Sequence, residues 1–287
     1  APLAAGAFDV ALVGWQGVAG SHKALRASAT PWLLVDRGPP VFSSILGRLQ
    51  RWEYKRAWGL TASSSGCVVK SEALADWARV KTNCPEPMTL MPAGVDLERF
   101  QVGEGSGSST IIYHGRLDSE RNVSLLVDIG DELVARENEL KMHLIGAGNA
   151  WDSLAKSARD RDWLMLSAAV SPEEIPAVLA VADVGLFPLP DSPQWRVASA
   201  LKIREWAACG LPVVASDIES HRSLGEREWL RLLPAGSPPD AWGEAVLEVL
   251  SKRAELGGKA RRDAEAEFSW EMATEALHEY LLELAGA

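Results

Sequence analysis

Between residues 110 and 215, short apolar runs rich in β-branched residues alternate with segments of helical periodicity, and this alternation limits the fold more than any other feature. Strands joined by helices of about 8–14 residues form βαβ crossovers, which produce a mostly parallel sheet with helices on both faces. We therefore predict a doubly wound α/β domain. Its predicted strands are 111–115, 141–145, 163–166, 184–187 and 212–215, and its predicted helices are 123–136, 151–159, 172–180 and 200–209.

The first 100 residues show the same alternation less regularly. A Gly/Ser-rich stretch follows at 102–109, which is typical of a flexible linker, so we place a domain boundary there. Upstream of it we predict a second, smaller doubly wound layer. Its predicted strands are 8–14, 32–36, 66–70 and 89–91, and its predicted helices are 43–58 and 71–78.

Charge and cysteine content exclude several classes of protein. The chain carries 29 Lys+Arg and 39 Asp+Glu, a net charge of −10, which argues against a nucleic-acid-binding surface. No apolar window approaches the roughly 18 residues of a membrane-spanning helix. Cys67, Cys84 and Cys209 are odd in number and lack the spacing of disulfide or metal pairs. They predict a reducing compartment, hence a cytoplasmic location.

Ligands of parallel α/β sheets bind beyond the carboxyl ends of the strands, so the residues after each strand are the first candidates for a site. Arg116 and Arg121 follow the predicted strand 111–115. Two guanidiniums there can converge on one anion, and the planar fork of arginine suits phosphate oxygens. The alternative is a pair of solvated surface arginines beside acidic neighbours, and the sequence gives both interpretations similar weight.

A second candidate is the helix that follows Ser199. We expect Ser199 to be its N-cap and Gly210 its C′ residue. The backbone N–H groups of Ala200–Lys202 would then face the mouth of the sheet, where a helix N-terminus binds phosphate. Glu205, about one and a half turns along, is placed to accept hydrogen bonds from ribose hydroxyls. Its alternative role is an exposed helical charge, and Lys202 either supports the phosphate site or is solvated.

Gly146 and Gly148 form the third candidate, a Gly-x-Gly after a strand. Trp151 stands where the dinucleotide fingerprint needs its third glycine, and no acidic residue closes a following strand at the required distance. A dehydrogenase is therefore the least favoured enzyme class. We interpret the turn as one that lets a nucleotide approach the sheet.

Together the motifs resemble one family. The set reads Met91-Pro-Ala-Gly-Val-Asp-Leu-Glu-Arg-Phe100, Tyr113-His-Gly-Arg-Leu-Asp118, His143-Leu-Ile-Gly-Ala-Gly148, Ser171-Pro-Glu-Glu-Ile-Pro176, Ala182-Asp-Val-Gly-Leu-Phe-Pro188 and Glu205-Trp-Ala-Ala-Cys-Gly-Leu-Pro-Val-Val-Ala215. In this order it resembles the group-1, family-four-like glycosyltransferases. The resemblance implies a GT-B-like α/β fold, in which two doubly wound Rossmann-like domains face each other across a cleft. The predicted domains are then a partial N-terminal acceptor-side domain (1–101), the linker (102–109), a nucleotide-sugar-binding domain (110–267) and a helix that returns to the first domain (268–287).

The resemblance also assigns roles, residue by residue. The donor diphosphate would meet Arg116, Arg121, Ala200, Leu201 and Lys202. The donor ribose would meet Glu205, and the base would lie near Gly146, Ala168, Ala169 and Val170. The resemblance implies a retaining transferase that needs no metal and no cofactor besides its nucleotide-sugar donor, with positive side chains and a helix dipole stabilising the leaving group.

The chain departs from the family pattern at several positions. Val197 replaces a second glutamate eight residues before Glu205, and Asn122 stands where glycine is usual. The first domain is expected to be incomplete, with its opening strands and glycine-rich loop missing. No side chain is assigned as catalytic base. His22, His114 and His143 qualify only by residue type, and a surface or core histidine is the favoured interpretation of each.

The segment 45–58 combines four basic residues with three aromatic ones. A helix of this kind contacts an anionic membrane or a phosphorylated lipid acceptor, which would place the protein at the inner membrane face. The favoured alternative is that Ile45, Leu49 and Trp52 form a core-facing stripe with solvated arginines around it.

Two functional classes follow from the sequence. The first is a glycosyltransferase that moves a sugar from a nucleoside-diphosphate donor to a hydroxyl of a sugar, lipid or small-molecule acceptor with retention. The second is a truncated or degenerate relative that binds a nucleotide and acts through a partner. Donor turnover separates the two.

Overall fold

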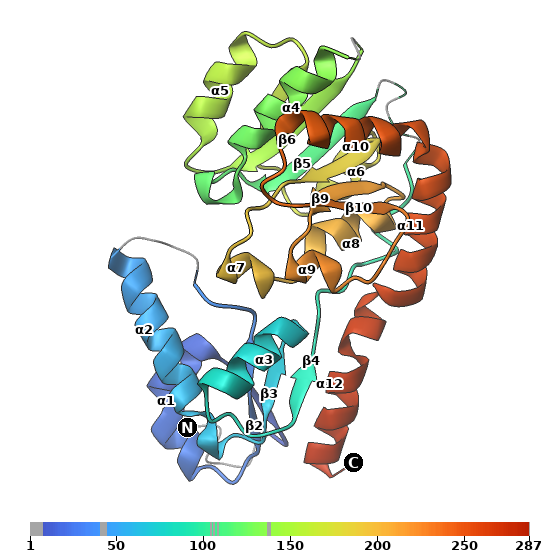
Figure 1. The fold of residues 1–287 in the computed structure, drawn as a ribbon. Helices are drawn as coiled ribbons and strands as arrows, with labels where there is room; N and C mark the ends of the chain where they lie inside the picture. The colour runs from blue at the N-terminus through green and yellow to red at the C-terminus, as the bar shows by residue number, and fades with distance from the viewer. Residues whose placement is uncertain are drawn as a thin grey trace. The chain divides into compact units, whose positions relative to one another are not determined.

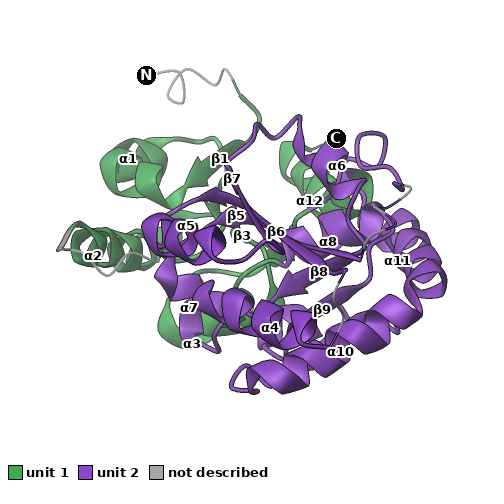
Figure 2. Ribbon diagram, turned by 90° about the horizontal axis from the view of Figure 1, so that it is seen from above, with its two compact units in different colours: residues 1–93, 196–199, 271–287 green, residues 94–195, 200–270 purple. Residues whose placement is uncertain are grey.

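The computed structural model describes residues 8–40, 45–103, 105, 107, 109–136 and 139–286. The chain divides into two compact units, which Figure 2 shows in different colours. Unit 1 comprises residues 1–93, 196–199 and 271–287, and unit 2 comprises residues 94–195 and 200–270. The predicted linker, 102–109, lies partly outside the described residues, and the boundary placed there stays a prediction. Within the described part of the chain, no helix is both long and apolar enough to span a bilayer.

Unit 1 contains a parallel sheet of four strands in the order β1-β2-β3-β4, of which Figure 1 labels β2, β3 and β4. Its strands are β1 (Ala11–Gly14), β2 (Trp32–Asp36), β3 (Cys67–Val69) and β4 (Met88–Leu90). The connections hold α1 (Trp15–Ala27), α2 (Ile45–Gly59), the 3₁₀ turn η2 (Thr61–Ser63) and α3 (Glu72–Lys81). The parallel pairing confirms the predicted α/β layer, and α1 is a helix that the sequence pattern missed.

The two faces of this sheet carry different cores. Successive side chains of a strand point to opposite faces. On one face, Trp32 and Leu34 join a core built from the buried sides of α1, α2 and α3. On the other, Leu33 and Val68 pack against Leu277 of α12 (Trp270–Ala285). The last helix of the chain thus completes the first sheet.

Helix α2 turns a different face inward than predicted. The core-facing residues are Tyr54, Ala57 and Trp58, whereas Leu49 and Trp52 are 58% and 60% exposed. The core-facing role favoured for Leu49 and Trp52 is therefore wrong. The inner face is fixed by Asp36, which accepts hydrogen bonds from the Tyr54 hydroxyl and from Trp58 Nε1. Both aromatic residues must lie against the sheet to reach it.

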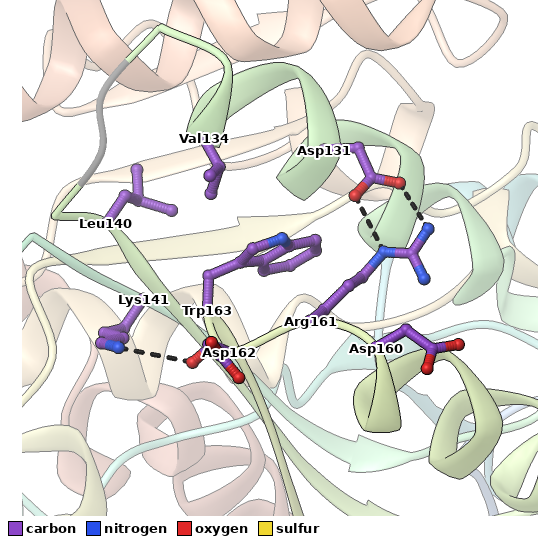
Figure 3. Close-up of a pocket in the computed structure, with 8 residues that line it drawn as sticks. All are labelled: Asp131, Val134, Leu140, Lys141, Asp160, Arg161, Asp162 and Trp163. Carbon is purple, nitrogen blue, oxygen red and sulfur yellow. Dashed lines mark hydrogen bonds and ion pairs between the residues drawn. The ribbon is translucent and has the colours of Figure 1, made fainter.

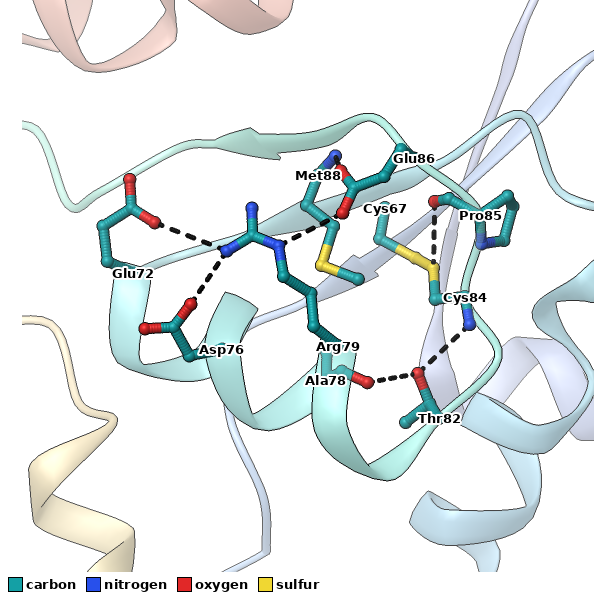
Figure 4. Close-up of polar contacts among 10 residues, drawn as sticks. All are labelled: Cys67, Glu72, Asp76, Ala78, Arg79, Thr82, Cys84, Pro85, Glu86 and Met88. Atoms are coloured by element: carbon teal, nitrogen blue, oxygen red, sulfur yellow. Dashed lines mark hydrogen bonds and ion pairs between the residues drawn. A yellow bond between two sulfur atoms is a disulfide. The ribbon is translucent and has the colours of Figure 1, made fainter.

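The cysteine prediction is also wrong, because Cys67 and Cys84 form a disulfide (Figure 4). Cys67 lies in β3, and Cys84 lies in the loop between α3 and β4. Because β3 and β4 are adjacent strands, the loop returns close to Cys67. Cys209 is free and buried. The cysteines therefore no longer argue for a reducing compartment, and the cytoplasmic location stays a prediction.

Unit 2 contains a parallel sheet of six strands in the order β10-β9-β8-β5-β6-β7. The strands are β5 (Thr110–Arg116), β6 (Lys141–Ala147), β7 (Leu164–Ala168), β8 (Val184–Phe187), β9 (Val213–Ser216) and β10 (Leu230–Leu233). The helices are η3 (Ser119–Arg121), α4 (Ser124–Val134), α5 (Trp151–Arg159), α6 (Ile175–Leu179), α7 (Pro193–Arg196), α8 (Leu201–Ala208), α9 (Glu219–Arg222), α10 (Pro239–Ser251) and α11 (Arg253–Glu267). The predicted strands and helices between 110 and 215 are all present, with shifted ends.

Burial in unit 2 fits a sheet covered on both faces. Every residue of β8 and β9 is buried. Helix α4 packs against α10, and α8 packs against α11. Central strands of this kind have no polar side, so their sequence is a continuous apolar run. The predicted doubly wound α/β class is confirmed.

Candidate functional site

The sheet of unit 2 changes direction between β5 and β8. From β5 the chain builds outward through β6 and β7, and it then returns to build β8, β9 and β10 on the other side. Helices leave a crevice at such a switch point, beyond the carboxyl ends of the two strands. The candidate site is therefore the region after Arg116 of β5 and Phe187 of β8, with α8 beside it.

Lys202 of α8 crosses the end of β5. A Cβ built on Gly115 would lie 2.5 Å from Lys202 Cε, and Gly115 has φ +123°, so only glycine leaves this path open. The Lys202 ammonium lies 5.7 Å from the centre of the Phe187 ring. Burial, together with the charge of Arg121, lowers the pKa of Lys202 to about 8, while Glu205 opposes the shift. The Lys202 ammonium is therefore close to a second cation, the Arg121 guanidinium. Two neighbouring cations repel each other, so this pair favours the binding of an anion between them.

Arg121 is held by an aromatic platform. Its guanidinium lies 4.4 Å over the Trp195 ring, and Trp195 Nε1 donates to the Glu120 carbonyl at 3.2 Å. The 3₁₀ turn that carries Arg121 ends at Asn122 in the left-handed region, with φ +58°. Asparagine is one of the few non-glycine residues that adopt this region readily, which explains why it can stand where the family has glycine.

Arg116 is placed differently from Arg121. It makes a bidentate ion pair with Asp118, with two 2.9 Å contacts, and its side chain is 58% exposed. The guanidinium lowers the pKa of Asp118. Asp118 Oδ1 also accepts from the Asn149 N–H at 3.1 Å, so the carboxylate connects the loops after β5 and β6. Arg116 lies at the predicted edge of the sheet, but its charge is already balanced.

Glu205 lies on α8 with its carboxylate close to β5. Glu205 Oε2 is 3.1 Å from His114 Nε2, and the Glu205 side chain is 16% exposed. Sequence reasoning favoured an ordinary core or surface histidine at 114. The residue is indeed buried, but it contacts the predicted ribose ligand. The one signal of this contact in the sequence is a polar residue, His114, within the predicted strand 111–115.

The start of α8 shows that the predicted N-cap, Ser199, is wrong by one residue. Ala200 occupies the N-cap position, and Ser199 Oγ instead accepts from the Ala93 N–H at 3.0 Å. The first-turn N–H groups of α8, including those of Leu201 and Lys202, still have no acceptor within the helix. The end of α8 is as predicted, because Gly210 has φ +69° and its N–H donates to the Ala207 carbonyl.

The predicted base-proximal residues lie at the same edge of the sheet. Gly146 pairs with Ala168 in the register of β6 and β7. A Cβ on Gly146 would lie 1.7 Å from the Gly115 carbonyl oxygen, so this glycine is needed for close backbone packing. Ala168 and Ala169 are exposed and Val170 is half-buried. The structure brings these four residues to one edge without distinguishing which meets a base.

The other candidate histidines lie elsewhere. His143 Nε2 is 2.7 Å from Ser167 Oγ in the body of the sheet, and burial lowers its pKa. His22 lies on α1 in unit 1. Neither lies at the carboxyl edge of β5 or β8.

A separate hollow of about 650 Å³ lies at the opposite edge, next to the amino ends of β6 and β7 (Figure 3). Its cations are already paired: Arg161 makes two hydrogen bonds to Asp131, and Lys141 Nζ donates to the Asp162 carbonyl. Trp163 lies at its base, packed against Gly130. Because ligands of parallel sheets bind at the carboxyl edge, we do not place the site here.

Comparison with known proteins identifies the class. Residues 108–252 match the family described as "Glycosyl transferases group 1". The chain belongs to this family, and its α/β units have the GT-B fold of solved glycosyltransferases. Sucrose-phosphate synthase from Thermosynechococcus elongatus aligns with a TM-score of 0.78 at 18% identity, over 98% of this chain and 75% of that one. Anabaena HepE in complex with UDP aligns with a TM-score of 0.73 at 16% identity, over 95% and 78%.

Curated relatives are similar in sequence, but these alignments cover a smaller share of each chain than the structural alignments do. D-inositol 3-phosphate glycosyltransferase of Geodermatophilus obscurus is 26% identical over 67% of this chain and 46% of its own length. A GDP-mannose-dependent monoacylated α-(1-6)-phosphatidylinositol monomannoside mannosyltransferase of Corynebacterium glutamicum is 25% identical over 65% and 54%. The chain spans about half the length of these relatives.

Proposed function

We propose that the protein transfers a sugar from a nucleoside-diphosphate donor to a hydroxyl acceptor, with retention at the anomeric carbon. Unit 2 binds the donor in this proposal. Arg121, Lys202 and the first turn of α8 hold the diphosphate, Arg116 adds a weaker contact, and Glu205 accepts the ribose hydroxyls. The base lies toward Gly146, Ala168, Ala169 and Val170.

The observation that carries the proposal is the grouping of Arg121, Lys202 and Glu205 at the β5/β8 switch point. Arg121 and Glu205 both act on the pKa of Lys202, so the three charges are close to one another. Two cations beside one carboxylate match a diphosphate joined to a ribose. The arrangement also suits the leaving group, because fixed positive charges stabilise the diphosphate as its bond to the sugar breaks. In this proposal these positive charges do the work of a metal ion, so the transfer needs no metal.

The names of relatives support the donor and suggest an acceptor. One relative is named as GDP-mannose-dependent, and a solved neighbour is described in complex with UDP. Several relatives are named for phosphatidylinositol mannosides. We propose a nucleotide sugar as the donor and a polar headgroup of a lipid as the acceptor, in preference to a free sugar or small molecule.

The outer face of α2 supports a lipid acceptor. Leu46, Leu49 and Trp52 are 63%, 58% and 60% exposed, and Arg56 lies over the Trp52 ring at 5.6 Å. Arg48 and Lys55 are exposed on the same helix. Exposed apolar side chains among cations bind the interface of an anionic membrane. We propose that this face contacts anionic lipid at the inner face of a cytoplasmic membrane.

Vesicle sedimentation tests the lipid contact. Wild-type protein should sediment with phosphatidylglycerol-containing vesicles and not with pure phosphatidylcholine. Trp52→Ser should reduce sedimentation several-fold, while Val181→Ser should not, since Val181 is 53% exposed in a segment, 176–187, that contains no basic residue. Equal sedimentation of all three proteins would overturn the lipid contact and leave the donor site standing.

Calorimetric titration with UDP, GDP and ADP, followed by turnover of the matching sugar nucleotide, tests the main proposal. One nucleotide should bind, and Glu205→Ala should weaken that binding while Glu279→Ala, an exposed glutamate of α12, does not. Binding together with transfer or hydrolysis of the donor supports the enzyme. Binding without turnover would instead support the second candidate, a nucleotide-binding module that acts through a partner.

A further inference from the structure

A buried chain of three side chains ends at the Glu205 carboxylate. Trp206 Nε1 donates to His114 Nδ1 at 3.1 Å, and His114 Nε2 is 3.1 Å from Glu205 Oε2. Trp206 is completely buried and His114 is 5% exposed. Glu205 and Trp206 are consecutive residues of α8, so one helix contacts both nitrogens of a single imidazole on β5.

The indole determines which nitrogen of His114 carries the proton. An indole N–H can only donate, so His114 Nδ1 must be an acceptor without a hydrogen. The single proton of the neutral ring is then on Nε2, where it is donated to Glu205. A doubly protonated ring would direct Nδ1–H at the indole N–H, and two donors facing each other cannot form a hydrogen bond. Burial also lowers the pKa of His114, with Lys202 lowering it further and Glu205 opposing.

The fold holds the indole in place. A Cβ on Gly185 of β8 would lie 2.4 Å from Trp206 Cε3, so the ring rests directly on the strand backbone. The Phe187 ring packs edge-on against it, with centroids 5.7 Å apart. Because both neighbours are buried, the direction of the indole N–H is fixed by packing, and the tautomer of His114 follows from it.

We propose that His114 is a positioning residue that orients the Glu205 carboxylate toward the donor ribose, with its tautomer set by Trp206. This rests on the proposed function, in which Glu205 is the ribose ligand. The His114 hydrogen bond occupies one site on Oε2 and fixes the plane of the carboxylate. The remaining lone pairs, chiefly those of Oε1, are then left to accept from the sugar hydroxyls.

Nucleotide binding by His114 variants tests this role. His114→Leu removes the donor, and we expect roughly tenfold weaker binding of the nucleoside diphosphate that wild type prefers. Preference for ribose over 2′-deoxyribose should fall with it. His114→Gln, whose amide nitrogen can reach the same position, should recover binding to within about threefold. His278→Leu, an exposed histidine of α12, serves as the matched control.

A double-mutant cycle separates positioning from general damage. If His114 acts through Glu205, then His114→Leu has no further effect on affinity in a Glu205→Ala background. A merely structural histidine would weaken binding in both backgrounds. Unchanged ribose preference in His114→Leu, while Glu205→Ala loses it, would overturn this inference alone. No effect of Glu205→Ala would overturn the proposed ribose site as well.

Nitrogen NMR of the imidazole in wild-type protein tests the tautomer without any variant. We expect a pyridine-type shift for His114 Nδ1 and a pyrrole-type shift for Nε2 at neutral pH. A protonated Nδ1, or a ring that carries both protons, would overturn the assignment whatever the variants do.

Discussion

Each unit has a carboxylate close to a central strand of its sheet, and the two carboxylates are held in opposite ways. Asp36, at the end of β2 in unit 1, is 1% exposed and accepts from the Gly38 N–H, the Tyr54 hydroxyl and Trp58 Nε1. Glu205, beside β5 in unit 2, accepts from His114 and keeps 16% of its side chain exposed.

The difference distinguishes a structural carboxylate from one that can bind. Asp36 has three donors around it, and desolvation raises its pKa despite them. Its hydrogen bonds fix α2 on the sheet through Tyr54 and Trp58. Glu205 is oriented from its buried side and remains open on the other. A carboxylate with one fixed contact and some exposure is ready for a ligand, whereas a saturated one is part of the core.

The largest expected effect is on stability, from Asp36→Ala. The change leaves the Tyr54 hydroxyl and Trp58 Nε1 buried without their acceptor, and we expect a loss of about 2–5 kcal/mol in the free energy of unfolding. Asp36→Asn keeps one acceptor oxygen and should lose less. Denaturant titration followed by circular dichroism measures both. A change within about 0.5 kcal/mol for Asp36→Ala would mean that Asp36 does not anchor α2.

Glu205→Ala should show the reverse pattern. Loss of its hydrogen bonds to ribose should cost about 10- to 150-fold in nucleotide affinity, with little change in unfolding. Glu205→Gln keeps the size but loses the charge, and it should fall between alanine and wild type. Calorimetry with ribose and 2′-deoxyribose nucleotides measures the effect. A Glu205→Ala protein that still prefers ribose as wild type does would remove Glu205 from the site.

The sequence predicted one of these carboxylates and not the other. Glu205 is predicted because it lies in a motif that resembles the family's and about one and a half turns into a helix that Ser199 and Gly210 delimit in the sequence. The role of Asp36 depends on which face α2 turns inward, and that helix has two apolar faces. Leu49 and Trp52 are three residues apart and Tyr54 and Trp58 are four apart. Both spacings are helical, so periodicity alone cannot choose between the two faces. The hydrogen bonds to Asp36 decide, and they involve residues 18 and 22 positions away.

Other differences between the sequence predictions and the structure also arise from contacts between residues far apart in the chain. Helix α1 was missed because Gly17 and Gly20 lower its helix propensity, and packing against α2 overrides that. The Cys67–Cys84 disulfide depends on strand order, which spacing does not reveal. The contact between His114 and Glu205 spans 91 positions. By contrast, the carboxyl-edge location of Arg121 and Lys202 follows from the βαβ pattern itself.

A smaller effect should separate the two arginines of unit 2. Arg121→Ala removes a cation stacked on Trp195 and close to Lys202, and we expect about tenfold weaker nucleoside-diphosphate binding. Arg116→Ala should cost about threefold or less, since its charge is balanced by Asp118 and largely exposed. Arg159→Ala, an exposed cation in the last turn of α5, is the control. Equal losses for Arg116→Ala and Arg121→Ala would show that the Asp118 ion pair opens on binding.

The last effect is the pH dependence that Lys202 gives to nucleotide binding beside Glu205. Its pKa of about 8 means that the ammonium loses its proton above that pH, and a neutral amine no longer attracts a diphosphate. Affinity should therefore fall between pH 7.5 and 9.5, by about tenfold at most. Lys202→Met should bind more weakly than wild type at pH 7.5 and show a flat profile across this range, while Arg159→Ala should follow wild type.

Calorimetry near pH 8 in buffers of different ionisation enthalpy should detect proton uptake on binding, because the bound diphosphate raises the pKa of Lys202. A flat wild-type profile without proton uptake would mean that Lys202 stays charged throughout and that burial, with Arg121 nearby, does not lower its pKa.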